Sequence, residues 1–369
     1  MAKSVSTDAI EKRLEGGFAQ AGVSPYAPVG ETSELNTPDL LTEPVEGHPA
    51  AMSWKRLLSE HWDVVGIERL TRKKRKNNPI YRLRGPHGET VVAKRSRKER
   101  AQVERLIYQE VMPRIPLPGL EFHGLLEEPE GEFCWLFLEE AGGLIYTPLD
   151  EAHRAVAGRW LGQMHLATLP GEILARLPNR ETAYYLQVVR DCRSIFLDHL
   201  SRNPTLSNDG AALFNRMVEH LNRLESAWSK LENICEAMPR TLVHGDFSGK
   251  NIRVPDGACA GALLVFDWEF AGWGVPATDL AQSVHKVARP DLNVYCSVLK
   301  PAYPHLELVQ LQGVAACGNA FRMVDEIRWT MMTFPDFGSR EYLIKTGLDL
   351  PFYEPVLAKA LEILQEALA

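Results

Sequence analysis

The sequence has little cysteine and no long apolar run. Its six cysteines are scattered over 369 residues, and none shows the two-residue spacing of a zinc knuckle or a thioredoxin-like site. The longest stretch without a charge, residues 16–30, has 15 residues and two prolines, whereas a membrane span needs about 20 apolar residues. Charged residues interrupt the first fifteen positions, so we expect no secretory signal. These absences predict a cytoplasmic protein with reduced core thiols and no membrane contact.

Charge of one sign is concentrated in one segment. The chain has a net charge of −7, but residues 72–105 hold 13 Lys and Arg against three Glu. A local basic segment in an acidic protein points to an anionic ligand at one place. The 45% hydrophobic and 24% charged residues are ordinary for globular proteins, which excludes a wholly disordered chain.

The pattern of residues predicts a leader and two units. Residues 1–51 contain five prolines and are expected to be an extended or mobile leader. Residues 52–141 are rich in strand patterns and residues 142–369 in helix patterns, with Gly142 and Gly143 at the boundary. In the first unit we expect strands at 64–70, 80–84, 90–94 and 133–138 and helices at 52–62 and 96–112. In the second we expect helices at 149–166 and 214–238, and short strands at 241–244, 251–254 and 262–267.

Three polar residues follow or begin strands in the second unit. Asp246 lies in a tight loop after His244 and Gly245, Asn251 begins the next strand, and Asp267 ends the strand after that. Neighbouring strands would place Asn251 and Asp267 side by side, and amide and carboxylate oxygens are ligands that Mg²⁺ prefers. Asp246 would then be free to orient a hydroxyl or receive its proton, the arrangement that phosphoryl transfer needs.

This pattern resembles the aminoglycoside phosphotransferase and choline kinase-like family, which shares the protein-kinase fold. The His-Gly-Asp triplet, Asn251, Asp267 and the following Asp279 carry the resemblance, which covers roughly residues 52–340. It implies an α+β fold of two lobes: a small antiparallel-sheet lobe that binds nucleotide and a larger, mainly helical lobe. It also implies transfer of the γ-phosphate of ATP, with GTP as the alternative donor, to a hydroxyl of a small molecule such as an aminoglycoside, sugar, amino alcohol or natural product. Asp246 would be catalytic, and Asn251 and Asp267 would bind Mg²⁺.

The resemblance also implies nucleotide-binding residues in the first unit. Lys94 matches the lysine on the third strand, and Glu104 is expected to pair with it, although Glu110 lies closer to the centre of the apolar helix stripe. The segment from Glu139 to Ala141 would be the hinge whose backbone binds adenine. Two features depart from the family pattern: the loop at residues 72–76 has five cations and no glycine, and position 248 is serine where relatives carry a basic residue.

Several other interpretations were weighed. Residues 245–250 resemble a phosphate-binding loop, but the loop is one residue short and lacks the Ser or Thr that would hold Mg²⁺. Residues 272–277 resemble a dinucleotide fingerprint, but Pro276 interrupts it. His244, His165 and Asp279 are expected to be structural.

A kinase-fold pseudoenzyme or a nucleic-acid-binding module that uses the basic segment is the alternative function. A nucleic-acid partner is disfavoured, because Tyr81 is the only aromatic residue in that segment.

The acceptor and the oligomeric state are left open. The negative balance of the second unit is compatible with a cationic acceptor, and Tyr184, Tyr185, Asp191 and Arg193 are available there.

Overall fold

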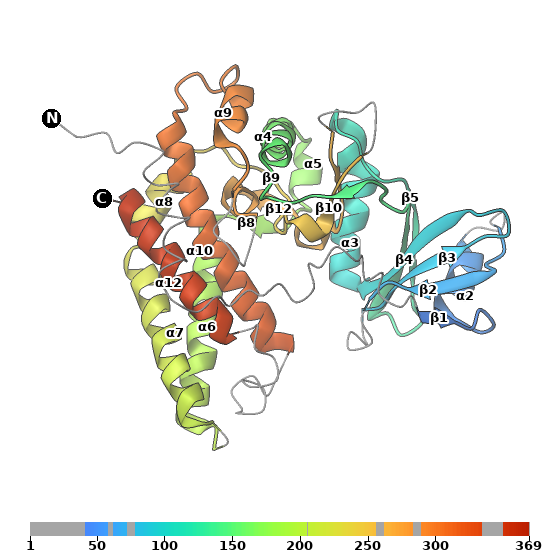
Figure 1. Ribbon diagram of the computed structural model, residues 1–369, viewed down its shortest axis with the longest axis horizontal. Helices are drawn as coiled ribbons and strands as arrows, with labels where there is room; N and C mark the ends of the chain where they lie inside the picture. Colours follow the sequence, from blue (N-terminus) through green and yellow to red (C-terminus); the bar gives the residue numbers. More distant parts are fainter. Residues whose placement is uncertain are drawn as a thin grey trace.

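The computed structural model describes residues 41–57, 62–71, 78–204, 206–255, 262–282, 289–333 and 350–368. The chain forms a sheet lobe and a larger helical lobe that lie side by side (Figure 1). This arrangement confirms the predicted α+β fold class with two lobes. The five consecutive cations at 72–76 and the first 40 residues of the expected leader lie outside the described residues.

The sheet lobe is built on one antiparallel sheet. Its order is β1-β2-β3-β4-β6-β5, and every neighbouring pair is antiparallel. The strands are β1 Leu41–Glu43, β2 Gly66–Arg69, β3 Ile80–Arg84, β4 Thr90–Arg97, β5 Phe122–Glu127 and β6 Phe133–Leu138. The predicted strands at 80–84 and 133–138 are confirmed at both ends. The sequence analysis did not foresee β5, whose residues are all partly exposed or exposed and show no clear alternation.

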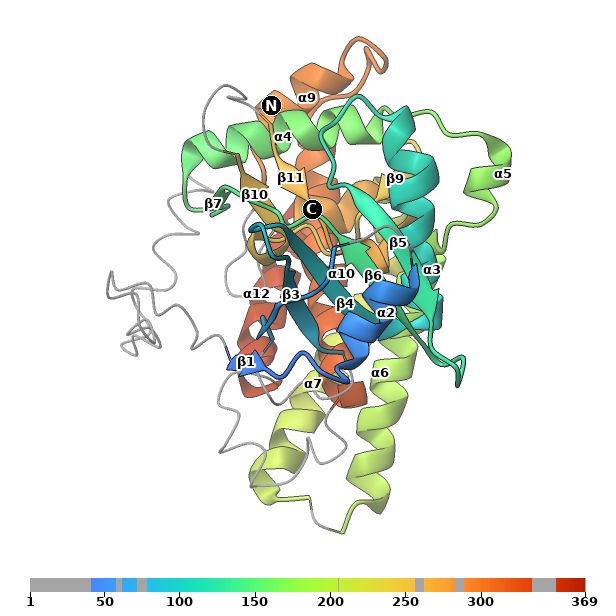
Figure 2. The same cartoon turned by 90° about the vertical axis from the view of Figure 1, so that its right-hand side faces the viewer.

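Alternate residues of the sheet pack on helix α2, Pro49–Leu57. Trp54 of α2 joins a core with Leu83, Val91 and Ala93. Because side chains alternate along a strand, Lys94 lies on the opposite face, towards the helical lobe. Figure 2 shows α2 on the face of the sheet turned away from that lobe. The sheet therefore has one face for its core and one face for the site.

The N-terminal boundary differs from the expectation. Residues 41–51, expected to be part of an extended leader, contribute β1, which pairs with β2, and the start of α2. The pairing of Leu41 with Arg69 and of Glu43 with Ile67 gives the chain a sheet partner that is distant in sequence. No local pattern in so short a strand could predict that partner.

Helix α3, Lys98–Leu106, follows β4 and connects the lobes. The predicted helix at 96–112 is shorter at its start, because Ser96 and Arg97 still pair with β6. After Leu106 the helix widens into a π-helical turn, Ile107–Val111, and ends in a 3₁₀ turn, Met112–Arg114. Contacts across the sheet thus override the local helical pattern at residues 96–97.

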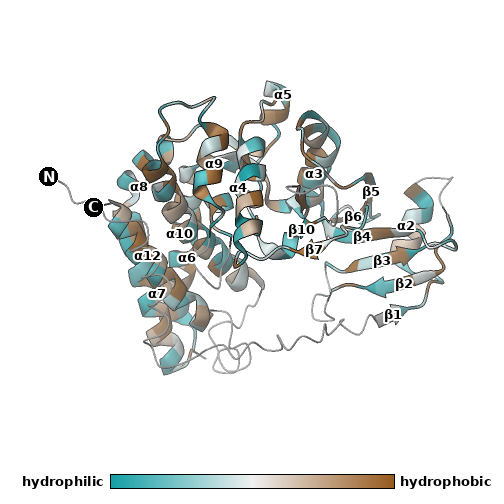
Figure 3. Cartoon of the chain, turned by 45° about the horizontal axis from the view of Figure 1, so that its top comes forward, coloured by the Kyte–Doolittle hydropathy of each residue, from teal (hydrophilic) through white to brown (hydrophobic). Residues whose placement is uncertain are grey.

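The helical lobe is a bundle around one large core. Its helices are α4 Glu151–His165, α5 Gly171–Leu174, α6 Thr182–Arg202, α7 Asn208–Ser226, α8 Trp228–Glu236, α9 Leu292–Leu299, α10 Leu308–Thr333 and α12 Leu350–Leu368. Figure 3 shows both hydrophobic and hydrophilic residues along these helices, as expected for helices that bury one side. No helix in the described part of the chain is long and apolar enough to cross a membrane.

The helix predicted at 214–238 is wrong as a single element. It divides at Ala227 into α7 and α8, because the two parts have different partners. Helix α7 packs against α6 and α12, whereas α8 packs against α10, where the rings of Trp228 and Phe321 are 5.5 Å apart. The apolar period continues through the break, so the sequence alone did not reveal it.

Two small sheets carry the loops between the lobes. One has the order β11-β10-β7 and the other β8-β12-β9. Their strands are β7 Leu144–Ile145, β8 Asn179–Arg180, β9 Thr241–Val243, β10 Ile252–Val254, β11 Leu264–Val265 and β12 Gly272–Gly274. The three predicted short strands correspond to β9, β10 and β11.

The thiols behave as expected. Cys134, Cys192, Cys235, Cys296 and Cys317 are free and buried, and Cys259 lies outside the described residues.

Candidate active site

One buried carboxylate braces the loop after β9. Asp279 accepts hydrogen bonds from the backbone amides of His244 at 2.8 Å and Gly245 at 2.9 Å. Gly245 has a φ of +80°, and a Cβ there would lie 2.4 Å from the carbonyl oxygen of Phe270. Glycine is therefore required at this turn, and the loop presents Asp246 from a fixed backbone.

The two histidines near this loop are structural. His244 Nε2 lies 3.1 Å from the carbonyl oxygen of Phe266, which can only accept, so Nε2 carries the proton. The Nδ1 atom accepts from the backbone amide of Asp246 at 3.2 Å. Burial lowers the pKa of His244, which keeps the ring neutral. His165 Nε2 lies 3.3 Å from Asp279. Both rings thus hold the loop, as the sequence analysis expected.

The carboxylate of Asp246 has four side-chain contacts. Its Oδ1 accepts from Arg322 Nη2 at 2.6 Å and from Ser248 Oγ at 3.2 Å. Its Oδ2 accepts from Asn251 Nδ2 at 2.9 Å and lies 2.7 Å from Lys250 Nζ. The four contacts occupy the lone-pair directions of both oxygens. A hydroxyl that binds to Asp246 must therefore replace one of them.

Two of these partners are cations that the sequence analysis missed. Arg322 comes from α10 and is buried, whereas Lys250 comes from the loop itself and has an exposed side chain. Burial alone would raise the pKa of Asp246, but Arg322 and Lys250 together hold it well below its usual range. Asp246 is thus ionised. The only sequence feature that could have pointed to Arg322 is that it is the first charged residue after the uncharged stretch 308–321. Lys250 supplies the cation that position 248 lacks.

Asn251 and Asp267 lie next to each other, as predicted from the strand pattern. Strands β10 and β11 are paired, and the backbone amide of Phe266 donates to the carbonyl of Asn251 at 3.1 Å. Asp267 has a φ of +67° and is the only non-glycine residue with a positive φ in the described parts of the chain. Aspartate tolerates this conformation better than most residues. Because the amide nitrogen of Asn251 donates to Asp246, its Oδ1 remains as a ligand.

Lys94 joins the two lobes through ion pairs. Its Nζ pairs with Glu104 on α3 and with Asp267 after β11. Glu110, the other candidate partner, lies on the surface and pairs with Arg176. The geometry therefore identifies Glu104, which is fully buried, as the partner of Lys94.

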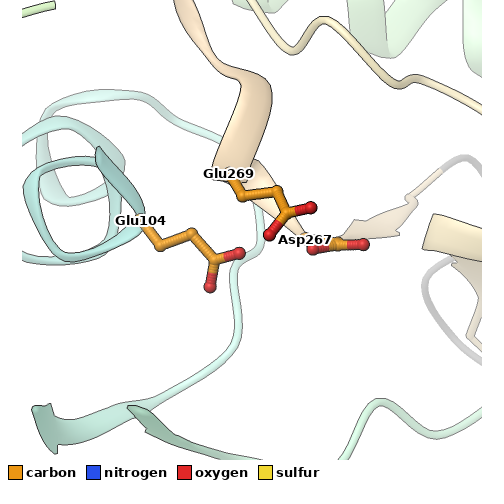
Figure 4. A group of neighbouring side chains, drawn as sticks. All are labelled: Glu104, Asp267 and Glu269. Carbon is orange, nitrogen blue, oxygen red and sulfur yellow. The ribbon is translucent and has the colours of Figure 1, made fainter. Parts of the chain in front are cut away.

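A third carboxylate, Glu269, belongs to the same cluster. Figure 4 shows the carboxylates of Glu104, Asp267 and Glu269 gathered at one place. One oxygen atom of each carboxylate lies within 4.8 Å of the other two. Glu269 lies 3.5 Å from Lys94 Nζ and also pairs with Arg100 at 3.1 Å. The sequence analysis gave it no role, and its position two residues after Asp267 was the only signal.

In this cluster, three carboxylates lie close together around the single ammonium group of Lys94. Burial alone would lower the pKa of Lys94, but Asp267, Glu104 and Glu269 raise it well above its usual value. Burial raises the pKa of Glu104 against the opposing effect of Lys94, and the two other carboxylates add to the rise. Glu104 Oε2 is buried and has no hydrogen-bond partner among the described residues. More positive charge would stabilise this cluster.

These residues fit a divalent metal ion. Asn251 Oδ1 and the carboxylates of Asp267 and Glu269 are hard oxygen donors, which Mg²⁺ prefers. The shortage of positive charge around the three carboxylates is the observation that supports the fit.

The expected hinge follows β6. The backbone amide of Glu139 donates to the carbonyl of Glu121 at 2.9 Å. Neither the carbonyl of Glu139 nor the amide of Ala141 forms a backbone hydrogen bond with another described residue outside helices and strands. The carboxylate of Glu140 between them accepts from Arg82 Nε on β3 at 2.7 Å, which ties the segment to the sheet. The Glu139 carbonyl and the Ala141 amide thus offer an acceptor and a donor to a ligand.

The two rejected phosphate-loop patterns have other structures. Residues 249–251 form a 3₁₀ turn and continue into β10, so no helix follows the loop. Residues 272–274 form β12. Neither segment provides the helix N-terminus on which those motifs depend.

The candidate acceptor residues fall in different places. Tyr185 is buried in the core, Arg193 pairs with Glu225, and Asp191 accepts from Gln187. Both tyrosines contact α10: the Tyr185 ring stacks on Phe321 with centroids 4.5 Å apart, and the Tyr184 hydroxyl lies 3.5 Å from Asp325. The structure thus distinguishes the two tyrosines, which contact α10, from Asp191 and Arg193, which the sequence alone could not do.

The family profile described as "Phosphotransferase enzyme family" matches residues 73–297. The chain belongs to this family. The match covers the sheet lobe from β3 onward, the loop that carries Asp246 and the strand before Asp267, so it includes both halves of the site. The predicted family resemblance and the predicted phosphotransferase class are both confirmed. Among curated proteins, none matches the chain significantly.

Solved structures of phosphotransferases share this fold. A spectinomycin phosphotransferase in complex with ADP and spectinomycin has a TM-score of 0.52 and 13% identity, over 86% of this chain and 98% of that one. A Plasmodium vivax ethanolamine kinase has a TM-score of 0.56 and 12% identity, over 85% and 86%. A Cryptosporidium parvum choline kinase has a TM-score of 0.53 and 13% identity, over 81% and 89%. At such low sequence identity these similarities establish the fold of this phosphotransferase. The acceptor has to be inferred from the residues of its own site.

Proposed function

We propose that this phosphotransferase is an ATP-dependent kinase that transfers the γ-phosphate to a hydroxyl group of a small molecule. The observation that carries the proposal is the meeting of two sets of residues. Lys94, Glu104 and Asp267 form one ion-pair cluster, and Asp246 and Asn251 form a hydrogen-bonded pair beside it. Strand β4 and helix α3 thus supply the nucleotide-binding residues, and the loops next to β9, β10 and β11 supply the hydroxyl-orienting group and the proposed metal ligands.

The nucleotide end of the site is assigned to the sheet lobe and its hinge. Lys94 would contact the α- and β-phosphates, and Glu104 would hold the ammonium in place. The Glu139 carbonyl and the Ala141 amide would bind the edge of the base. The spectinomycin phosphotransferase with the same fold was solved in complex with ADP, which supports a nucleotide ligand. An acceptor and a donor at the hinge are compatible with the adenine edge, and ATP is the nucleotide that we propose.

Asn251 and Asp267, with Glu269 beside them, would hold Mg²⁺. When bound there, the ion would neutralise charge on the transferred phosphates. Lys250 Nζ, now at Asp246, has an exposed side chain. It is the residue that we assign to contact the γ-phosphate, because Ser248 cannot supply a charge.

At the acceptor end, Asp246 would align the attacking hydroxyl. A bond forms between the hydroxyl oxygen and the γ-phosphorus, the bond from that phosphorus to the β,γ-bridging oxygen breaks, and ADP leaves. The hydroxyl proton passes to Asp246. Because the pKa of Asp246 is held low, the carboxylate is a weak base, so its main contribution is orientation and the proton moves late.

Substitution of Asp246 by Asn tests the proposal. The amide keeps the shape but cannot take the proton, so we expect turnover to fall roughly 10²–10⁴-fold while Mg-ATP still raises the melting temperature. Acceptors would be screened for the mass gain of one phosphoryl group. Equal phosphorylation by the Asp246→Asn protein would contradict the assignment.

The same assay distinguishes the alternative function. A pseudoenzyme or nucleic-acid-binding module predicts stabilisation by RNA and none that depends on Mg²⁺ together with ATP. Stabilisation by Mg-ATP, lost in Lys94→Ala and kept in the exposed control Lys55→Ala, is the expected result.

A further inference from the structure

We propose that Arg322 selects the acceptor: it donates to an anionic oxygen group, a carboxylate or a phosphate ester, that the acceptor carries next to the hydroxyl aligned by Asp246. The acceptors would then be hydroxy acids or hydroxylated phosphate esters, and not the polycations considered from the sequence. This inference rests on the proposed function, because it concerns the same site.

Arg322 has hydrogen-bonding capacity that the protein does not use. Its two acidic partners both contact the same nitrogen: Nη2 lies 2.6 Å from Asp246 Oδ1 and 3.5 Å from Glu326 Oε1. The other two nitrogens, Nε and Nη1, are buried and have no hydrogen-bond partner among the described residues. The side chain is only 5% exposed. Buried donors are almost always satisfied, and an unsatisfied one marks a place for a water, an ion or a ligand.

The position of Arg322 is fixed by the packing of its helix. Gly318, one turn earlier on α10, lies so close to the segment 276–280 that a Cβ there would be 1.8 Å from the carbonyl oxygen of Ala277. Asp279 in the same segment braces the loop that carries Asp246. Arg322 and Asp246 are therefore held to one rigid frame. A ligand that contacts both must have its two polar groups a few bonds apart.

The charge balance at Asp246 favours an anionic acceptor group. A hydroxyl that replaces Arg322 at Asp246 Oδ1 leaves the guanidinium without its main counter-ion. A carboxylate or phosphate on the acceptor restores that counter-ion, and Arg binds such groups in a planar geometry. An ammonium at the same place would lie beside Arg322, whose contact with Asp246 is 2.6 Å. Like charges at that distance repel strongly where water is excluded.

The test compares acceptors of different charge. D-Glycerate represents the hydroxy acids and glycerol 3-phosphate represents the phosphate esters, whereas L-serine and L-homoserine are zwitterions that carry an ammonium beside the carboxylate. Glycerol is the neutral comparison, and ethanolamine, choline and spectinomycin are the cationic ones. We expect the phosphoryl mass gain with at least one anionic acceptor, and the two anionic arms distinguish a carboxylate from a phosphate ester.

Variants of Arg322 show whether the recognition acts through this residue. For the reacting anionic acceptor, Arg322→Gln should raise KM about tenfold or more with the KM for ATP unchanged, and Arg322→Lys should restore part of the loss. Arg176→Gln, at an exposed pair with Glu110, is the control and should leave both values unchanged. Melting temperatures establish that each variant is folded.

The outcomes separate this inference from the proposed function. Turnover confined to neutral or cationic acceptors, or absent with both D-glycerate and glycerol 3-phosphate, overturns the role of Arg322 and leaves the kinase assignment standing. An Arg322→Gln protein with lower kcat and the same KM for anionic and neutral acceptors also overturns it, because Arg322 would then only position Asp246. Failure of Mg-ATP to bind would instead overturn the kinase assignment.

Discussion

Lys94 and Asp267 form an ion pair between the sheet lobe and the helical lobe, although 173 residues separate them in the chain. Lys94 lies on β4, on the face of the sheet opposite α2, and Asp267 follows β11 in a left-handed conformation. The pair brings the two lobes together at the point where the nucleotide phosphates are proposed to bind. Changes to either residue or to their neighbours should therefore affect phosphate and metal binding before they affect the fold.

Substitution of Glu104 by Gln should lower kcat/KM for ATP by roughly 100-fold, because a misplaced ammonium costs about this much in a positioned reaction. Glu104 is a buried partner of Lys94, whereas Glu110 is on the surface with Arg176. Glu110→Gln is therefore a matched control and should change kcat/KM less than about twofold. Steady-state kinetics of both variants check the assignment, and a larger effect for Glu110→Gln would reverse it.

Asp267→Asn should weaken the Mg²⁺ requirement of turnover with little change in stability. Asparagine, like aspartate, tolerates the positive φ of +67° at this position, but its amide is a poorer ligand for Mg²⁺. We expect the Mg²⁺ concentration at half-maximal rate to rise about tenfold or more. Asp267→Ala should show the same loss and also a lower melting temperature from backbone strain. An unchanged Mg²⁺ titration in both variants would exclude Asp267 as a ligand.

Gly318→Ala should destabilise the protein by about 2 kcal/mol or more, because the new methyl group overlaps the backbone of residue 277 and helix α10 must shift. The control is Gly171→Ala, where a Cβ meets nothing within 4 Å. That change should be neutral or slightly stabilising. Urea unfolding monitored by tryptophan fluorescence measures both, and equal stability of the two variants would mean that α10 can move away from the segment 276–280.

Asp325→Asn should be more stable than the wild type at pH 7 and equal to it near pH 4. Burial raises the pKa of Asp325 to about 6, despite nearby arginines, from an ordinary value of 3.8. The folded protein therefore binds more protons than the unfolded chain between these values, and the wild type loses stability as pH rises through them. The loss amounts to roughly 1–2 kcal/mol after allowance for partial exposure. Denaturant unfolding at pH 4, 5.5 and 7 tests the sign.

The polar residues of the motif could be predicted because they are tied to local patterns. Asp246 and Asp267 each follow a short apolar run and Asn251 precedes one, and paired strands bring such ends together. The preference for Glu104 over Glu110 came from family spacing, while the stripe of apolar residues pointed to the other glutamate. The contact with Lys94 settled that choice.

Arg322 and Glu269 could not be assigned from the sequence. Arg322 reaches Asp246 from a helix 76 residues away, and its role depends on how closely α10 packs at Gly318. Glu269 is near Asp267 in sequence, but only the approach of α3 gives it Glu104 and Arg100 as neighbours. Both depend on contacts between elements that no periodicity records.

The sequence by itself determined which lobe is sheet and which is helix, the family, and the identity of the residues that end the short strands, because alternation, helical period and turn chemistry are local properties of the chain. Only the tertiary structure decided the pairing of β1, the break at Ala227, the partner of Lys94 and the two cations at Asp246. Each of these depends on which distant surface an element packs against, and burial then sets the charge balance that its side chains experience.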